Sequence, residues 1–117
     1  MLQIVVVDVG HRIKVPLKPE ILIGREDANS DVFPEVDLTP YGALRKGVSR
    51  CHAKITCHDD ELTVEDVGSV NGTFLKGHRL IPYQAMPINS GDMLQLGTLV
   101  LQVHFDLPKS VETQPSK

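Results

Sequence analysis

The sequence has few cysteines, few aromatic residues and no tryptophan. Two cysteines in 117 residues are too few for the disulfide framework on which many small secreted domains depend. If Cys51 and Cys57 lie on one strand, they are roughly 20 Å apart, whereas a disulfide needs Cα atoms within about 7 Å. We therefore expect two free thiols. The same separation argues against a zinc site shared by Cys51-His52 and Cys57-His58.

A long hydrophobic run is also missing. The apolar run from Ile4 to Val7 is followed directly by Asp8, and it is too short to span a bilayer or to form the centre of a secretion signal. Hydrophobic residues make up 41% of the chain and charged residues 23%, which are ordinary values for a globular protein and exclude general disorder. We expect a cytoplasmic protein that does not act at a membrane.

The sequence lacks both an excess of positive charge and a catalytic motif. Its net charge of −3 argues against a broad nucleic-acid-binding surface. It contains no Gly-x-Ser-x-Gly elbow, no phosphate-binding loop ending in Gly-Lys-Ser/Thr and no His-Glu-x-x-His helix. The rival hypothesis of an enzyme built around His58, Asp59 and Asp60, or around Cys51 and His52, is weak because the first three residues are typical of a polar hairpin turn. We expect no enzyme, cofactor or metal.

What the sequence does contain is a repeated apolar alternation with a period of two, which indicates half-buried strands. It is clearest where Leu99, Leu101, Val103 and Phe105 alternate with more polar neighbours. Similar short signals, separated by turn residues, occur at Ile4 to Val9, Ile13 to Leu17, Ile21 to Ile23, Ala53 to Cys57, Leu62 to Val64 and Met93 to Leu96. The pattern predicts an all-β sandwich or barrel in residues 1–106, followed by a flexible tail in residues 107–117.

One long segment, Glu26 to Val48, has weak strand signals and exceeds the usual loop length. Its first half holds only acidic charges, and basic residues follow. The acidic set is Glu26, Asp27, Asp31, Glu35 and Asp37, and the basic set is Arg45, Lys46, Arg50 and Lys54. The basic set predicts a local anion site, although two solvated loop faces of opposite sign would give the same pattern.

Three short motifs stand at the ends of predicted strands, and a fourth element follows them. They are Gly24-Arg25, Gly47-Val48-Ser49-Arg50-Cys51-His52-Ala53, Asp66-Val67-Gly68-Ser69-Val70-Asn71-Gly72-Thr73-Phe74 and the segment Ile88 to Gly97. Their order and spacing resemble the forkhead-associated (FHA) domain over nearly all of residues 1–106. The resemblance implies a two-sheet β-sandwich of the FHA/SMAD-like type, with about eleven strands, whose loops at one end grip a phosphothreonine.

The resemblance assigns the phosphate contacts to Arg25, Ser49 and Arg50. These residue types suit the task, because a phosphothreonine carries about −1.5 to −2 charges and three acceptor oxygens, which call for a guanidinium and neutral donors. Each assignment has an alternative. Arg25 could be a surface arginine paired with a neighbour such as Asp66, and Ser49 could be a turn hydroxyl.

The remaining motif residues are assigned to the peptide or to the scaffold. By the resemblance, Asn71 bonds the backbone of the bound peptide, and Gly47 stands where some members hold a charged selector. Val70 stands where many members have a threonine that contacts the phosphate, so one hydroxyl donor is missing here. The structural residues are Gly24, which allows the tight strand exit before Arg25, His52, which braces the binding loops, and Gly72, whose Asn-Gly pair also favours a tight turn.

The resemblance implies a phosphothreonine-dependent signalling adaptor. Its partner would be a threonine-phosphorylated protein, a target of a Ser/Thr kinase, with no nucleic acid or membrane involved. The alternative is an FHA-fold scaffold or oligomerisation domain that acts through another surface, since a fold alone does not fix a function. A further hypothesis is phosphorylation-dependent self-association, in which phosphorylated Thr113 of the tail occupies the pocket of a neighbouring molecule.

Overall fold

The described part of the chain, residues 1–106 of the computed structural model, is built from eleven strands and a single turn of 3₁₀ helix. The predicted tail, 107–117, and Thr113 lie outside the described residues. The strands are β1 (Leu2–Val6), β2 (His11–Val15), β3 (Glu20–Gly24), β4 (Val36–Asp37), β5 (Cys51–His58), β6 (Glu61–Asp66), β7 (Thr73–Leu75), β8 (His78–Arg79), β9 (Met86–Pro87), β10 (Met93–Leu96) and β11 (Leu99–Phe105).

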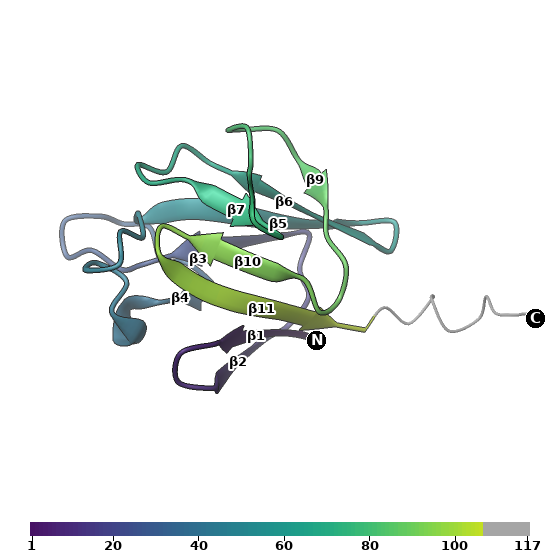
Figure 1. Ribbon diagram of the computed structural model, residues 1–117, viewed down its shortest axis with the longest axis horizontal. Coiled ribbons are helices and arrows are strands. Elements are labelled where there is room, and N and C mark those ends of the chain that lie inside the picture. Colours follow the sequence, from purple (N-terminus) through teal and green to yellow (C-terminus); the bar gives the residue numbers. More distant parts are fainter. Residues whose placement is uncertain (107–117) are drawn as a thin grey trace, which may run out of the picture.

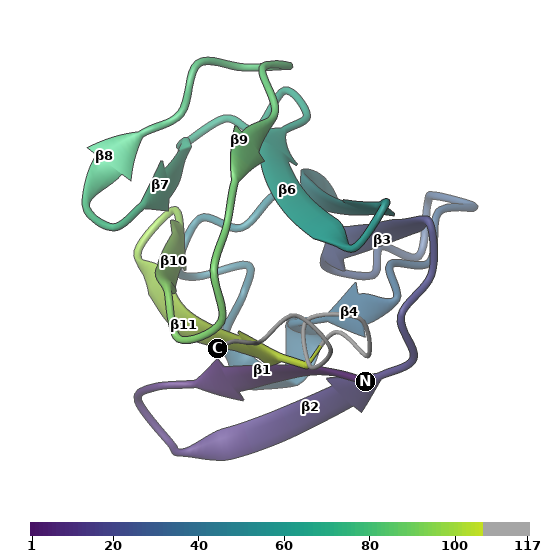
Figure 2. The ribbon, with the colours of Figure 1, turned by 90° about the vertical axis from the view of Figure 1, so that its right-hand side faces the viewer.

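The strands form two sheets that pack face to face (Figures 1 and 2). One sheet has the order β2-β1-β11-β10-β7-β8, and the other has the order β4-β3-β5-β6-β9. Neighbouring strands are antiparallel except for β3 and β4, which run parallel. The predicted all-β, two-sheet sandwich with about eleven strands is therefore confirmed.

The core lies between the sheets and follows the predicted alternation. On β11, Leu99, Leu101 and Val103 are fully buried, and Phe105 is partly buried against them. The paired strand β1 contributes Leu2 and Ile4, which are also fully buried. Each such side chain stabilises the fold by about 1.5 to 3 kcal/mol relative to exposure.

Two predicted strand boundaries were wrong. The first strand ends at Val6 rather than Val9, because Gly10 N–H donates to the Val6 carbonyl at 2.8 Å and closes a turn. Val9 is consequently 68% exposed. The second strand ends at Val15 rather than Leu17, since Pro16 has no N–H with which to continue the ladder.

The four strands that the sequence did not predict, β4, β7, β8 and β9, have only two or three residues each. A period of two cannot be recognised over so short a run. One of them, β4, lies inside the long segment from Glu26 to Val48, as does the 3₁₀ turn at Thr39–Tyr41. This segment is therefore partly ordered by pairing with β3.

Strand β5 and the turn that follows it show two predicted features. Asp59 and Asp60 connect β5 to β6 with positive φ angles of 51° and 65°, so the predicted polar hairpin turn is confirmed. Cys51 and Cys57 lie at two positions of the same strand, β5, and neither forms a disulfide. Within residues 1–106, no helix is long and apolar enough to cross a membrane.

Candidate anion-binding site

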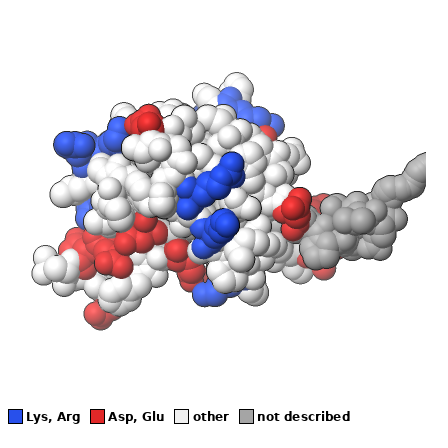
Figure 3. Space-filling model, turned by 90° about the horizontal axis from the view of Figure 1, so that it is seen from below, with Lys and Arg blue, Asp and Glu red and all other residues white. Residues whose placement is uncertain are grey.

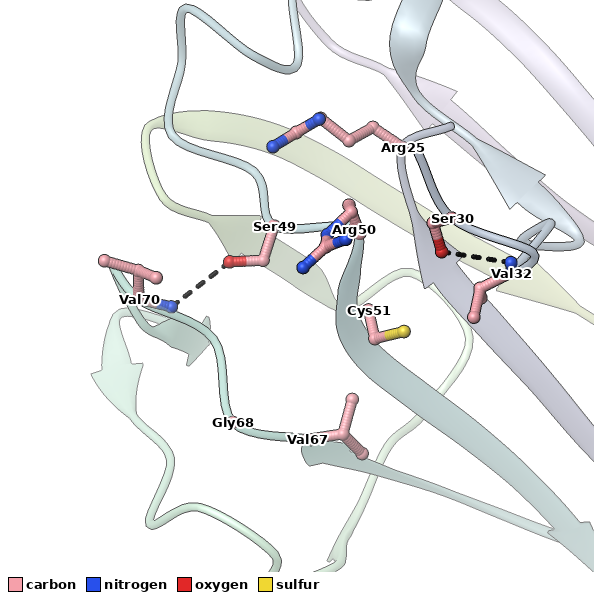
Figure 4. Close-up of a pocket in the computed structure, with 9 residues that line it drawn as sticks. All are labelled: Arg25, Ser30, Val32, Ser49, Arg50, Cys51, Val67, Gly68 and Val70. Atoms are coloured by element: carbon pink, nitrogen blue, oxygen red, sulfur yellow. Dashed lines mark hydrogen bonds between the residues drawn. The ribbon is translucent and has the colours of Figure 1, made fainter. Parts of the chain in front are cut away.

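A hollow of about 470 Å³ opens between the loops at one end of the sandwich (Figure 4). Three segments line it: the loop after β3, the start of β5 and the loop between β6 and β7. Its lining residues are Arg25, Ser30, Val32, Ser49, Arg50, Cys51, Val67, Gly68 and Val70. The structure thus brings together four of the predicted ligand-contacting residues, Arg25, Ser49, Arg50 and Val70.

A β-bulge sets the relative positions of the two arginines. Ile23 pairs with Ala53, but Gly24 pairs with Cys51, so His52 has no partner on β3. A methyl group on Gly24 would lie 1.9 Å from the carbonyl oxygen of Arg50, which is impossible without moving the strands apart. Glycine is needed at position 24 because the backbone of β5 approaches so closely, which carries Arg25 next to the Ser49-Arg50 segment.

Arg25 is held by its backbone neighbourhood and faces a carboxylate. Its Nε–H donates to the Val48 carbonyl at 2.8 Å, which fixes the direction of the side chain. Its Nη1 lies 3.9 Å from Asp27 Oδ2, and Arg50 Nε lies 3.8 Å from the same oxygen. The alternative partner considered from the sequence, Asp66, is wrong: the neighbouring acid is Asp27, two residues along the chain.

Ser49 and Val70 join two of the loops across the hollow. The backbone N–H of Val70 donates to Ser49 Oγ at 3.2 Å, as the dashed line in Figure 4 shows. Ser49 Oγ accepts this bond, so its own O–H proton can point to a ligand. The Val70 side chain is 81% exposed, so it serves no packing role in the free protein.

His52 is fully buried and links the Ser49 loop to the Asn71-Gly72 loop. The Ser49 N–H donates to Nδ1 at 3.0 Å, so Nε2 carries the proton and donates to the Gly72 carbonyl at 2.8 Å. Burial lowers the pKa of His52, and neither the bond to Gly72 nor the nearby Asp66 carboxylate reverses this. The imidazole is therefore neutral near pH 7, as both bonds require.

Asp66 organises the loop between β6 and β7, and sequence analysis did not assign it this role. Its Oδ1 accepts bonds from the hydroxyls of Ser69 and Thr73, and its Oδ2 accepts backbone N–H bonds from Gly68 and Ser69 at 3.1 Å. Burial alone would raise the pKa of Asp66, but these bonds hold it below the usual range. A signal was present: Leu62, Val64 and Asp66 share the inward face of one strand.

Asn71 and Gly47 lie beside a second hollow rather than in the first. Asn71 Nδ2–H donates to the Gly47 carbonyl at 3.0 Å. Gly47 has a φ of +83°, and a methyl group there would lie 2.6 Å from Asn71 Nδ2, so a larger residue would displace this amide. The second hollow, of about 500 Å³, is also lined by Arg45, Lys46, Phe74, Gln95, Gly97 and Thr98.

The predicted cluster of basic residues is not one site. Lys54 pairs with Glu20 at 3.6 Å, because both lie further along the β3–β5 ladder. Lys46 pairs with Asp8 at 3.0 Å and faces the second hollow, so of the predicted set only Arg50 lines the first. Figure 3 shows acidic side chains gathered at the loop end of one face with basic side chains beside them.

Comparisons with known proteins identify the fold. The family profile described as FHA domain matches residues 21–97. Protein FraH of Nostoc sp. is 38% identical over 69 residues, which are 59% of this chain and 24% of that protein. The oxoglutarate dehydrogenase inhibitor of Corynebacterium glutamicum is 35% identical over 80 residues, which are 68% of this chain and 47% of that protein. The chain thus spans less than half the length of either relative.

Solved structures give the same result. The N-terminal FHA domain of S. cerevisiae Rad53p in complex with a phosphothreonine peptide superposes with a TM-score of 0.73 at 17% identity, over 90% of this chain and 93% of that one. The FhaA FHA domain complexed with the intracellular domain of Rv3910 gives a TM-score of 0.67 at 22% identity, over 89% and 100%. Since the FHA profile covers well over half of the sequence and the sandwich superposes on these domains, the chain belongs to the FHA domain family.

Proposed function

We propose that this protein is a cytoplasmic signalling adaptor that binds a phosphothreonine-containing segment of a partner protein, the target of a Ser/Thr kinase. FHA domains are interaction modules, and the proposal is that this chain acts by binding rather than by catalysis. The observation that supports it best is the convergence of Arg25, Arg50 and Ser49 on one open hollow.

The hollow has the chemistry that a phosphate group needs. A phosphorylated threonine presents about −1.5 to −2 charges and three acceptor oxygens near pH 7. Two guanidinium groups supply positive charge and several N–H donors in fixed directions, and the Ser49 hydroxyl adds a neutral donor. In a protein whose net charge is −3, this local arrangement attracts an anion without making the whole surface basic.

The loops around the hollow are braced before any ligand arrives. His52 ties the Ser49 loop to Gly72, and Asp66 holds the turn that precedes Val70. A preorganised site loses less conformational entropy on binding, so more of the contact energy appears as affinity. Asn71, at the edge of the second hollow, is proposed to bond the peptide backbone beyond the phosphothreonine.

Replacement of one arginine tests the proposal. Arg25→Ala is expected to weaken binding of a phosphothreonine peptide by roughly tenfold to a hundredfold, because a charge-assisted hydrogen bond contributes about 1.5 to 3 kcal/mol. Arg12→Ala is the matched control, since Arg12 lies on β2 and bonds Gln3 instead of lining the hollow. Isothermal titration calorimetry with phosphorylated and unphosphorylated forms of one peptide measures both effects.

Two results would contradict the proposal. Binding of the unphosphorylated peptide as tight as that of the phosphorylated one would favour a scaffold that acts through another surface. If Arg25→Ala binds the phosphorylated peptide with wild-type affinity, Arg25 does not contact the phosphate. We also expect phosphoserine to bind more weakly than phosphothreonine, because the threonine methyl adds apolar contact area.

A further inference from the structure

Asp27 places a carboxylate beside both arginines of the hollow. Its Oδ2 is almost equidistant from the two guanidinium groups, at 3.9 Å from Arg25 Nη1 and 3.8 Å from Arg50 Nε. These distances exceed the 2.7–2.9 Å of a charge-assisted hydrogen bond, so the contacts are electrostatic, and the Arg25 Nε–H bonds the Val48 carbonyl rather than Asp27. The carboxylate therefore neutralises charge without occupying the donors.

Asp27 is held in place by its own loop. Its Oδ1 accepts the backbone N–H of Asn29 at 2.8 Å, and its carbonyl accepts the N–H of Ser30 at 3.0 Å. The loop continues into Ser30 and Val32, which line the hollow. The side chain is 25% exposed, so the carboxylate is partly screened by solvent.

We infer that Asp27 is an affinity-determining residue of this site: it competes with the ligand phosphate for Arg25 and Arg50 and so weakens phosphopeptide binding. The inference rests on the proposed function, because it takes the same hollow as the phosphate site. A phosphate drawn to the two guanidinium groups brings a second anion next to the Asp27 carboxylate. Two like charges this close repel, and the carboxylate must move or remain as an unfavourable neighbour.

The opposite role, in which Asp27 orients the arginines for the ligand, is less well supported. Arg25 already has a fixed direction, because its Nε–H donates to the Val48 carbonyl at 2.8 Å. The backbone of Arg50 is placed by the bulge at Gly24 and by the start of β5, and its side chain is 52% exposed. Loss of the Asp27 charge should therefore leave the Arg25 guanidinium in place and free both guanidinium groups for a ligand.

The loop supplies a matched control. Asp31 is an exposed acid four residues from Asp27, and within residues 1–106 it forms no ion pair with either arginine. Asp27→Asn and Asp31→Asn change the net charge equally. The asparagine at position 27 also keeps a side-chain oxygen that can accept the Asn29 N–H, so the loop geometry is conserved.

Calorimetry with one phosphothreonine peptide tests the inference on the full chain. Asp27→Asn is expected to bind about threefold to tenfold more tightly than the wild type, the size of effect that one nearby charge has at a partly exposed site. Asp31→Asn should change affinity by less than about twofold, because exposed charges without direct contacts are well screened. Weaker binding by Asp27→Asn, or equal gains in both variants, would overturn the inference.

A double-mutant cycle and a readout that needs no peptide complete the experiment. If competition acts through the arginines, the gain from Asp27→Asn should shrink in an Arg50→Ala background. Inorganic phosphate, followed through the side-chain Nε–Hε signals of Arg25 and Arg50 in NMR spectra, should saturate at lower concentration in Asp27→Asn than in the wild type or Asp31→Asn. If the wild type and Asp27→Asn reach saturation at the same phosphate concentration, the role of Asp27 is refuted, even if no peptide binds. If the protein only fails to distinguish phosphorylated from unphosphorylated peptide, the proposed function alone is refuted.

Discussion

Two aspartates beside the hollow, Asp66 at the end of β6 and Asp27 in the loop after β3, have opposite environments. Asp66 is 2% exposed and accepts bonds from two hydroxyls and two backbone N–H groups. Asp27 is partly exposed, and its contacts with Arg25 and Arg50 are too long to be hydrogen bonds. The Asp66 carboxylate accepts four hydrogen bonds from its own loop. The Asp27 carboxylate faces two guanidinium groups that the proposed phosphate ligand would also contact.

The contrast separates what builds the site from what sets its strength. A buried carboxylate with four donors cannot be removed without leaving those donors unsatisfied, which is costly. A partly exposed carboxylate at 3.8–3.9 Å contributes little to folding, because water and salt screen it. The two aspartates should therefore respond differently to the same substitution.

The largest expected effect is on stability. Asp66→Ala should lower the free energy of unfolding by about 3 kcal/mol or more, because the hydroxyls of Ser69 and Thr73 lose a buried acceptor. Asp27→Ala should change it by less than about 0.5 kcal/mol. Urea denaturation measures both values. Similar losses of unfolding free energy in the two variants would show that the two aspartates contribute equally to stability.

A second variant moves the arginines rather than the aspartates. Gly24→Ala places a methyl group 1.9 Å from the Arg50 carbonyl oxygen, so β3 and β5 must separate near the bulge. Overpacking of this kind costs about 1 to 3 kcal/mol, and phosphopeptide affinity should fall as well because Arg25 and Arg50 move apart. Gly10→Ala is a control with no neighbour within 4 Å, where any stability loss comes from its φ of +69° and affinity should not change.

A pH titration tests the two buried groups that hold the loops, His52 and Asp66. Burial lowers the pKa of His52 from its ordinary value of 6.5, so the folded state binds fewer protons than the unfolded state. The free energy of unfolding should therefore fall as the pH drops below about 6.5, until it passes the folded pKa. Asp66, whose pKa is lowered from 3.8, should add a second loss below that pH.

Replacement of His52 isolates the first of these two steps. The slope between pH 6.5 and the onset of the Asp66 loss should be reduced in His52→Gln, measured by urea denaturation at several pH values. His78→Gln, which removes an exposed histidine from β8, controls for the change in histidine count. An unchanged slope in His52→Gln would show that another group carries the dependence.

The smallest expected effect concerns the loop that Asp66 holds. Val70→Thr should tighten phosphothreonine binding by roughly 1 kcal/mol, or about fivefold, because the new hydroxyl can donate to the phosphate. Val70 is 81% exposed, so the hydroxyl stays solvated in the free protein and stability should barely change. Calorimetry and a thermal melt separate the effects, and a lower melting temperature with unchanged affinity would place Val70 away from the phosphate.

The sequence predicted the sheets better than it predicted the loops. In a long strand such as Leu99–Phe105, apolar residues at every second position predict which side chains are buried. The two-residue strands carry no such pattern, and they form because neighbouring strands offer unpaired backbone groups. The family motifs pointed to Arg25, Ser49, Arg50 and Val70, which the fold brings to one hollow.

Contacts between loops could not be predicted from the sequence, for a physical reason. Asp27 lies two residues after Arg25 in the same loop, but it meets Arg50 because the bulge at Gly24 brings the end of β3 against the start of β5. No local pattern encodes that approach, so the sequence predicted an anion site from the basic set without predicting that Asp27 of the acidic set would lie beside Arg50. Asp66 could have been found, because a charged residue on the inward face of an alternating strand requires partners.

The pairing of β1 with β11 gives the domain a practical geometry. Leu2 lies opposite Phe105, so the two ends of residues 1–106 meet at the side of the molecule away from the loops of the hollow (Figure 1). A fluorescent reporter or an immobilisation tag joined at either end would leave the hollow unobstructed. The same adjacency suits circular permutation, with a short linker closing the old ends and new ends opened at the Asp59-Asp60 turn.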